Sequence, residues 1–140
     1  MKTSLALPKR RRLHARAEFQ IVYAEGQRYD GRLLAAFLRK NDLTEHRLGV
    51  TASTKAVGKS VDRNRAKRLL RELFRRSAVE LKELQQEYDW ILNAKRSLLV
   101  ADESARFREF RNIIAQVARA ERRKSLTPSP LGEGRGEGRS

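Results

Sequence analysis

The sequence predicts an α/β fold, an α+β two-layer sandwich in which helices pack on a small mixed sheet. Three observations predict it. Helical and strand-like hydrophobic patterns follow one another in the order α-β-β-α-β-α, a long amphipathic helix joins two of the strands, and 140 residues allow one core. We therefore expect a single domain over residues 1–124, which opens with a basic arm at 1–12.

The first half of the chain predicts one helix and two strands. Residues 15–25 carry apolar side chains at helical spacing and end before Gly26, a suitable C-terminal stop. Residues 32–39 form a short apolar run whose length favours a strand over a helix. Residues 47–53 alternate between apolar and small or polar side chains, which is typical of a half-buried strand.

The second half predicts a long helix, a third strand and a last helix. The long helix starts with Ser60 or Asp62 as its N-cap and ends near residue 86. Residues 88–94 alternate and form the third strand. Asp102 or Ser104 caps the last helix, whose apolar residues recur at helical spacing.

The C-terminal segment differs from the rest in composition. Residues 125–140 contain Gly-Glu-Gly-Arg twice and have no apolar face. A segment with so little to bury cannot offset the entropy of ordering, so we expect a disordered Pro/Gly-rich tail.

The charge balance indicates a polyanionic partner. The chain has 32 Lys and Arg against 17 Asp and Glu, a net charge of +15 and a pI near 11.1. Nucleic acid is the expected partner and an anionic membrane surface the alternative. The absence of cysteine suits a reducing compartment, and we find neither a secretion signal nor a membrane span, which predicts a cytoplasmic protein.

The sequence contains no recognisable catalytic constellation. His14 and His46 lie far apart, outside any motif. There is no nucleophile elbow, no Walker-type phosphate loop and no acidic cluster suited to two metal ions. We therefore expect neither a catalytic residue nor a metal site in this chain alone.

The most informative segment runs from Lys55 to Arg76 and contains nine basic residues but only two acidic ones. These cations cannot all pair internally, and like charges four residues apart repel each other on a helix. The helical period at about 100° per residue places Lys67, Arg68, Arg71 and Arg75 on the arc opposite the apolar face. The pattern predicts that this helix binds a nucleic-acid backbone.

Aromatic residues offer a second mode of binding. A protein that binds single strands places aromatic rings on an exposed sheet surface, where bases stack on them. Phe19, Tyr23 and Phe37 are the candidates, with ordinary core packing as the alternative.

The run Arg-Asn-Arg-Ala-Lys-Arg-Leu-Leu-Arg-Glu at 63–72 closely resembles the signature of the bacterial ribonuclease P protein subunit. Shorter matches flank it in the right order, among them Glu18-Phe19 and Arg47-Leu48-Gly49, and the resemblance covers about residues 9–123. It implies the same element order, with a left-handed crossover that departs from the usual rule. Thr54-Lys55 stands where the family often has two lysines.

The resemblance also implies a function. The family's protein joins a catalytic RNA that removes the 5′ leader of precursor tRNA in the cytoplasm, with Mg²⁺ bound mainly by the RNA. The protein alone is non-catalytic, and no obligate protein partner is evident. Carried over by position, the residues that contact the catalytic RNA are Arg63, Asn64, Arg65, Lys67, Arg68 and Arg71. The leader-binding cleft is formed by Phe19, Tyr23 and Phe37, with Lys55 at its edge. The alternative is a ribosomal-type structural RNA-binding protein without a processing role.

Overall fold

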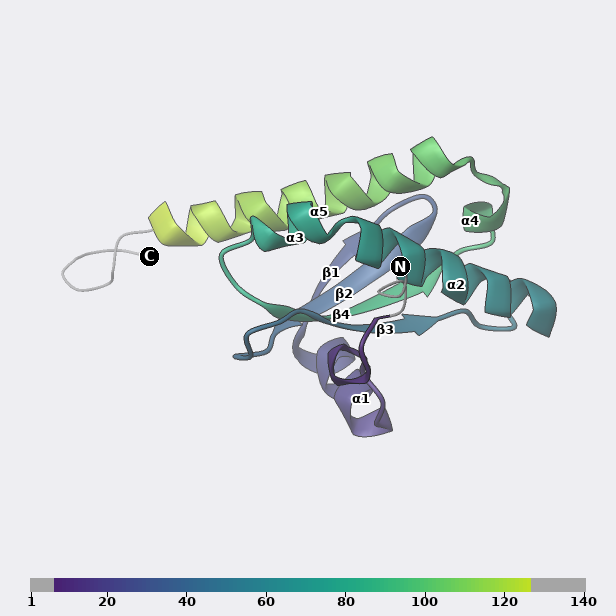
Figure 1. Ribbon diagram of the computed structural model, residues 1–140, viewed down its shortest axis with the longest axis horizontal. Coiled ribbons are helices and arrows are strands. Elements are labelled where there is room, and N and C mark those ends of the chain that lie inside the picture. The colour runs from purple at the N-terminus through teal and green to yellow at the C-terminus, as the bar shows by residue number, and fades with distance from the viewer. Residues whose placement is uncertain (1–6, 127–140) are drawn as a thin grey trace.

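The computed structural model describes residues 7–126 (Figure 1). A 3₁₀ turn at Lys9–Arg11 precedes the main elements. These are α1 (Arg16–Glu25), β1 (Gln27–Asp30), β2 (Leu34–Lys40), β3 (Arg47–Thr51), α2 (Ser60–Arg76), α3 (Ala78–Lys82), β4 (Tyr88–Ala94), α4 (Ser97–Val100) and α5 (Glu103–Leu126). Most of the predicted disordered tail, residues 127–140, lies outside the described residues.

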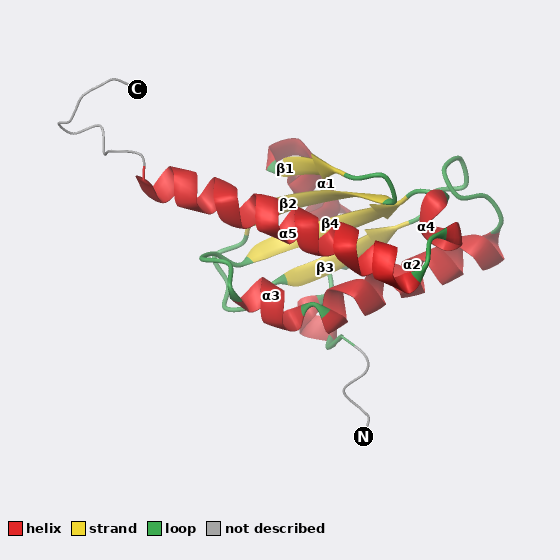
Figure 2. Cartoon of the chain, turned by 90° about the horizontal axis from the view of Figure 1, so that it is seen from above, coloured by secondary structure: helices red, strands yellow, loops and turns green. Residues whose placement is uncertain are grey.

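The four strands form one mixed sheet in the order β1-β2-β4-β3. β2 pairs antiparallel with both β1 and β4, whereas β3 and β4 are parallel neighbours. The connection from β3 to β4 runs through α2 and α3, as the predicted order requires. Figure 2 shows α2 and α5 on one face of the sheet and α1 on the other. The predicted α/β class and mixed sheet are confirmed, and the handedness of the crossover stays a prediction.

The main core lies between the sheet and the layer of α2 and α5. Trp90 of β4 is fully buried there, with its ring centroid 6.2 Å from that of Phe74 and 5.8 Å from that of Phe110. Leu34 and Leu92 from neighbouring strands point to the same side. Burial of these large side chains supplies most of the driving force that joins helices to sheet. A smaller cluster of Leu13, Val22 and Ile91 lies under α1 on the opposite face.

Two predicted elements need correction. β1 was not among the strands predicted from the sequence. Three of its four residues are polar and exposed, and only Tyr29 packs against the core, so the strand has no alternating apolar pattern. The long helix does not continue to residue 86: α2 ends at Arg76, and a buried Ser77 separates it from α3. Beyond this break, Leu81 of α3 packs in the main core.

The predicted helix starts are partly confirmed. Asp102 caps α5, since its side-chain oxygen accepts a hydrogen bond from the Ala105 N–H at 2.8 Å. Neither Ser60 nor Asp62 caps α2, which begins after Lys59 without a side-chain cap. None of the helices in the described part of the chain is long and apolar enough to cross a membrane.

A buried histidine joins three segments of the core. His46 Nδ1 accepts hydrogen bonds from the Tyr88 N–H at 3.0 Å and from Trp90 Nε1–H at 3.1 Å. Its Nε2 lies 3.1 Å from the Leu81 carbonyl and donates to it. Both ring nitrogens are therefore used by the neutral imidazole. Burial lowers the pKa of His46, although the Leu81 carbonyl and the Glu87 carboxylate act in the opposite direction.

This arrangement predicts a loss of stability at mildly acidic pH. Because the folded state disfavours protonated His46, the unfolded state binds more protons once the pH falls below the ordinary histidine pKa of about 6.5. We expect the free energy of unfolding to decrease from about pH 7 toward pH 5 more steeply in the parent than in His46→Gln, as measured by urea titration at several pH values. Equal slopes for the two proteins would contradict this assignment of the neutral ring.

Candidate nucleic-acid interface

The outward arc of α2 carries an unpaired group of cations. Ala66, Leu70, Leu73 and Phe74 are the buried residues of this helix and fix the side that faces the core. The opposite side presents Asn64, Lys67, Arg68 and Arg71, none of which has a hydrogen-bond or ion-pair partner among residues 7–124. We call these four residues the α2 arc. Three cations without a carboxylate beside them are suited to a chain of phosphates.

The structure places the other two predicted RNA contacts on the flanks of this arc. Arg63 is half-buried and donates through Nε to the Gly58 carbonyl at 3.0 Å. Arg65 turns toward α4, with Nη1 3.4 Å from the Leu99 carbonyl. Their main-chain contacts indicate that these two arginines also fix the ends of neighbouring loops.

On the other face of the sheet, α1 and β2 bring two of the predicted aromatic residues together. The ring of Tyr23 meets that of Phe37 edge to face, with centroids 4.8 Å apart. Tyr23 is 40% exposed and Phe37 is half-buried, so part of this pair is open to solvent. We call the exposed area around Tyr23 and Phe37 the aromatic surface.

Phe19 lies beside this surface, one turn earlier on α1. Its ring lies against Gly49 of β3, where a Cβ atom would come within 2.5 Å of the ring. Glycine is therefore required at position 49 if the ring keeps this place. Phe19 and Phe37 both pack on the small cluster of Leu13, Val22 and Ile91, so the three predicted aromatic residues share one face of the sheet.

A hollow of about 220 Å³ lies between Phe19, beside the aromatic surface, and Arg71 of the α2 arc. Phe19 and Gly49 line it from the sheet side, Arg12 and His14 from the N-terminal segment, and Arg71 from α2. Arg71 also belongs to the α2 arc. The hollow therefore places an aromatic ring of α1 and a cation of the RNA-binding helix around the same space.

The aromatic surface contains polar residues that the sequence reading missed. Asn93 Oδ1 accepts hydrogen bonds from Tyr23 Oη at 2.9 Å and from Thr51 Oγ1 at 2.7 Å. Arg28 of β1 places its guanidinium carbon 5.4 Å from the centroid of Phe37. These side chains come from different strands and meet only through the strand register. No single stretch of the sequence therefore predicts that they lie together. The predicted Lys55 is exposed in the loop before α2 and takes part in none of these contacts.

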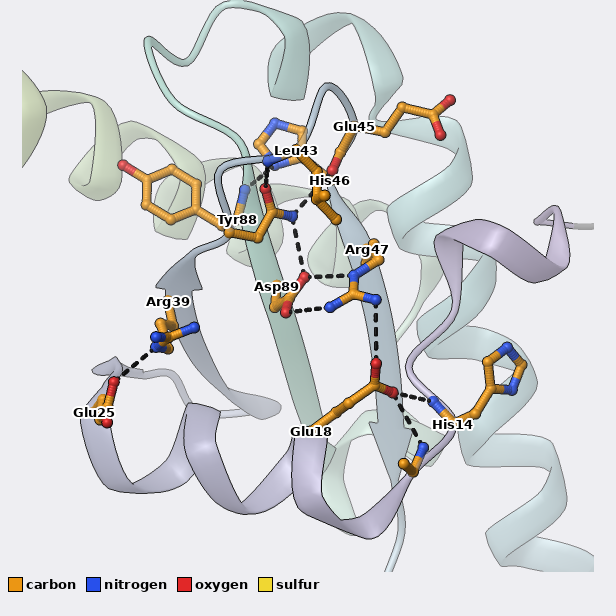
Figure 3. Close-up of polar contacts among 12 residues, drawn as sticks. His14, Glu18, Glu25, Arg39, Leu43, Glu45, His46, Arg47, Tyr88 and Asp89 are labelled. Atoms are coloured by element: carbon orange, nitrogen blue, oxygen red, sulfur yellow. Dashed lines mark hydrogen bonds and ion pairs between the residues drawn. The ribbon is translucent and has the colours of Figure 1, made fainter.

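An ionic network fixes α1 on the sheet (Figure 3). Arg47 donates to both carboxylate oxygens of Asp89, at 2.8 and 2.7 Å, and to Glu18 of α1 at 3.2 Å. Glu18 also accepts hydrogen bonds from the N–H groups of His14 and Ala15. The His14 N–H, and then the neighbouring Ala15 N–H and Arg47, lower the pKa of Glu18 against the effect of burial. The carboxylate therefore stays ionised and holds the start of α1 in place.

Among residues 7–124, no three His, Asp or Glu side chains lie together as a candidate metal site.

Comparison with known proteins identifies the family. The family model described as Ribonuclease P matches residues 7–118. A ribonuclease P protein component from Coxiella burnetii is 35% identical over 114 residues, which cover 81% of this chain and 91% of the relative. One from Clostridium botulinum is 42% identical over 89 residues, covering 64% of this chain and 78% of the relative.

Solved structures agree with this match. The RNase P protein from Thermotoga maritima superposes with a TM-score of 0.65 at 26% identity and covers 75% of this chain and 96% of that one. The Staphylococcus aureus protein, at 24% identity and a TM-score of 0.63, shares the fold over 77% of this chain and 94% of its own. Since the family model spans most of the domain that carries the α2 arc, the chain belongs to the ribonuclease P protein family, the protein subunits of the endoribonuclease that processes the 5′ end of precursor tRNA.

Proposed function

We propose that this subunit binds the catalytic RNA of ribonuclease P through α2 and the single-stranded 5′ leader of precursor tRNA through the face that carries α1. Lys67, Arg68 and Arg71 bind phosphates without reading sequence. Tyr23 and Phe37 offer ring faces and edges on which any base can stack. A subunit that serves many precursors with unrelated leaders needs this combination of contacts that are independent of sequence.

The observation that supports this division most directly is the shared hollow. Phe19 and Arg71 line one space, although they are 52 positions apart in the sequence and come from helices on opposite faces of the sheet. A single strand that stacks on the aromatic surface can therefore pass the edge of β3 and meet the cations of α2. Arg28 and Asn93 add a guanidinium and an amide to the leader path that we propose.

The same proposal assigns different chemical roles to the RNA and the protein. We propose that the RNA performs the hydrolysis with Mg²⁺ that it binds mainly by itself, and that the protein holds and orients the substrate. Its contribution is positional, since substrate that is held in place reacts with less loss of entropy at the moment of cleavage.

Removal of the Tyr23 ring tests the leader contact. Loss of one stacked base costs about 1–3 kcal/mol, so we expect Tyr23→Ala to weaken binding of leader-bearing precursor by the holoenzyme roughly 5- to 150-fold. Binding of mature tRNA should stay unchanged. Tyr23→Phe keeps the ring and loses only the hydrogen bond to Asn93, so it is the matched control and should lose far less. If Tyr23→Ala lost equal affinity for precursor and mature tRNA, this would contradict binding of the leader at the aromatic surface.

A further inference from the structure

α5 carries a second basic surface on its side away from the sheet. Arg108, Arg111, Arg119 and Arg122 are exposed and fall within an arc of about 80° on the helix. The arc lies opposite the residues that face the core, which are Phe110, Ile113, Ile114 and Val117. We call the four arginines the α5 stripe.

No carboxylate neutralises this stripe. α5 has three acidic residues, and each of them is used elsewhere. Glu103 pairs with Arg76 of α2. Glu109 accepts hydrogen bonds at 2.8 to 2.9 Å from three consecutive main-chain N–H groups in the turn before β2. Glu121 accepts two main-chain N–H groups and the Tyr88 hydroxyl.

The arginines of the stripe are consequently unpaired. Within residues 7–124 none of the four has an ion pair, and the only recorded contact of Arg111 is with the ring of Phe107, 6.0 Å from its centroid. Arg108 and Arg111, and likewise Arg119 and Arg122, are three residues apart, where like charges repel and destabilise a helix. An ordinary solvated helix face alternates charges of both signs, and this one does not.

The stripe is also rigidly placed. Glu109 fastens one part of α5 to the turn before β2, and Glu121 fastens a later part to the loop before β4. From Arg108 to Arg122 the stripe spans about 21 Å at 1.5 Å per residue. Figures 1 and 2 show α5 over the sheet face opposite α1, so the stripe points away from the aromatic surface.

We propose that the α5 stripe is a second RNA-binding surface, which contacts the phosphate backbone of a folded segment of the ribonuclease P RNA distinct from the segment on α2. This inference rests on the proposed function for the identity of the RNA. Guanidinium groups bind phosphates in a bidentate manner and do so without reading bases. A membrane fits less well, because between residues 104 and 122 the other residues on this arc are Ser104 and Ala115, which offer no large apolar side chain for insertion.

Salt dependence of RNA binding tests the proposal. We would compare Arg119→Gln/Arg122→Gln with the parent, titrating a bacterial ribonuclease P RNA at several salt concentrations. Loss of two phosphate contacts should reduce the slope of log K against log salt by about 1.5 to 2 and weaken binding on the order of tenfold at 0.15 M salt. The matched control, Arg32→Gln/Lys82→Gln, removes the same charge from exposed positions outside both helices and should change the slope far less.

A third variant separates this proposal from the proposed function. Lys67→Gln/Arg71→Gln removes two charges from the α2 arc and should reduce both affinity and slope. If it does so while the α5 variant behaves like the control, the α5 stripe is a solvated surface and only this inference is overturned. If neither variant differs from the control, RNA binding through α2 fails as well.

A tethered probe locates the contact independently of affinity. The chain has no cysteine, so Ala115→Cys introduces one attachment site in the middle of the stripe for an iron chelate that cleaves nearby RNA. Val61→Cys, 76% exposed near the start of α2, serves as the matched site. We expect cleavage of two different RNA segments from the two positions. Cleavage from position 61 without cleavage from position 115 would overturn the proposal.

Discussion

Replacement of Lys67 and Arg71 by alanine is expected to weaken binding of ribonuclease P RNA about a hundredfold at 0.15 M salt. Both side chains lie on the α2 arc and have no partner among the described residues, so neither is needed to hold the fold. A hydrogen bond to a charged group contributes about 1.5–3 kcal/mol, and two such losses amount to roughly 3 kcal/mol or more. Because phosphate contacts release counterions, the dependence of affinity on salt should fall at the same time.

The matched control lies on the same helix. Arg75 is paired with Glu72 at 2.9 Å, and its replacement by alanine removes a positive charge that is already partly neutralised. We expect Arg75→Ala to lose less than threefold in a fluorescence titration with the same RNA. Losses of equal size per charge at positions 67, 71 and 75 would mean that net charge, rather than the α2 arc, determines affinity.

The second large effect concerns stability. Asp89 is 5% exposed and accepts two hydrogen bonds from Arg47, so Arg47→Leu leaves a buried carboxylate with Asn41 as its remaining side-chain donor. Loss of one partner of a buried ion pair costs about 3–5 kcal/mol. We expect the free energy of unfolding to fall by about 3 kcal/mol, measured by urea titration. α1 should also lose its contact through Glu18.

Two further variants make that result interpretable. Arg10→Leu removes an arginine from the exposed pair with Glu45 and should leave stability close to that of the parent. Arg47→Leu/Asp89→Leu removes both charges of the pair and should regain much of the loss, because the cost comes from the unpaired buried carboxylate. If Arg47→Leu proves as mild as Arg10→Leu, the network in Figure 3 does not hold α1 on the sheet.

The elements with strong periodic patterns could be predicted from the sequence. β2, β3, β4, α1 and α5 lie close to their predicted positions, since alternating or helical burial leaves a local signal. β1 leaves none, because it is a strand only through its pairing with β2. The end of α2 at Arg76 also leaves no local signal, because the helical pattern of the sequence continues through Ser77 into α3.

The residues of the candidate site also differ in whether a local sequence pattern predicts their position. Lys67, Arg68 and Arg71 could be placed on one arc because the helical period alone determines which side chains share a face. The flanking positions of Arg63 and Arg65 depend on loops that pack against them. Arg28, Thr51 and Asn93 come together only through strand register, so no local pattern could have assigned them to the aromatic surface.

The most direct test of the account is single-turnover cleavage of precursor tRNA at low Mg²⁺ by a bacterial ribonuclease P RNA, with and without this protein. We expect strong stimulation of cleavage at the 5′ leader junction when RNA and protein are both present, and no cleavage by the protein alone. Failure to stimulate several such RNAs that nevertheless bind the protein would contradict the proposed role in holding the precursor.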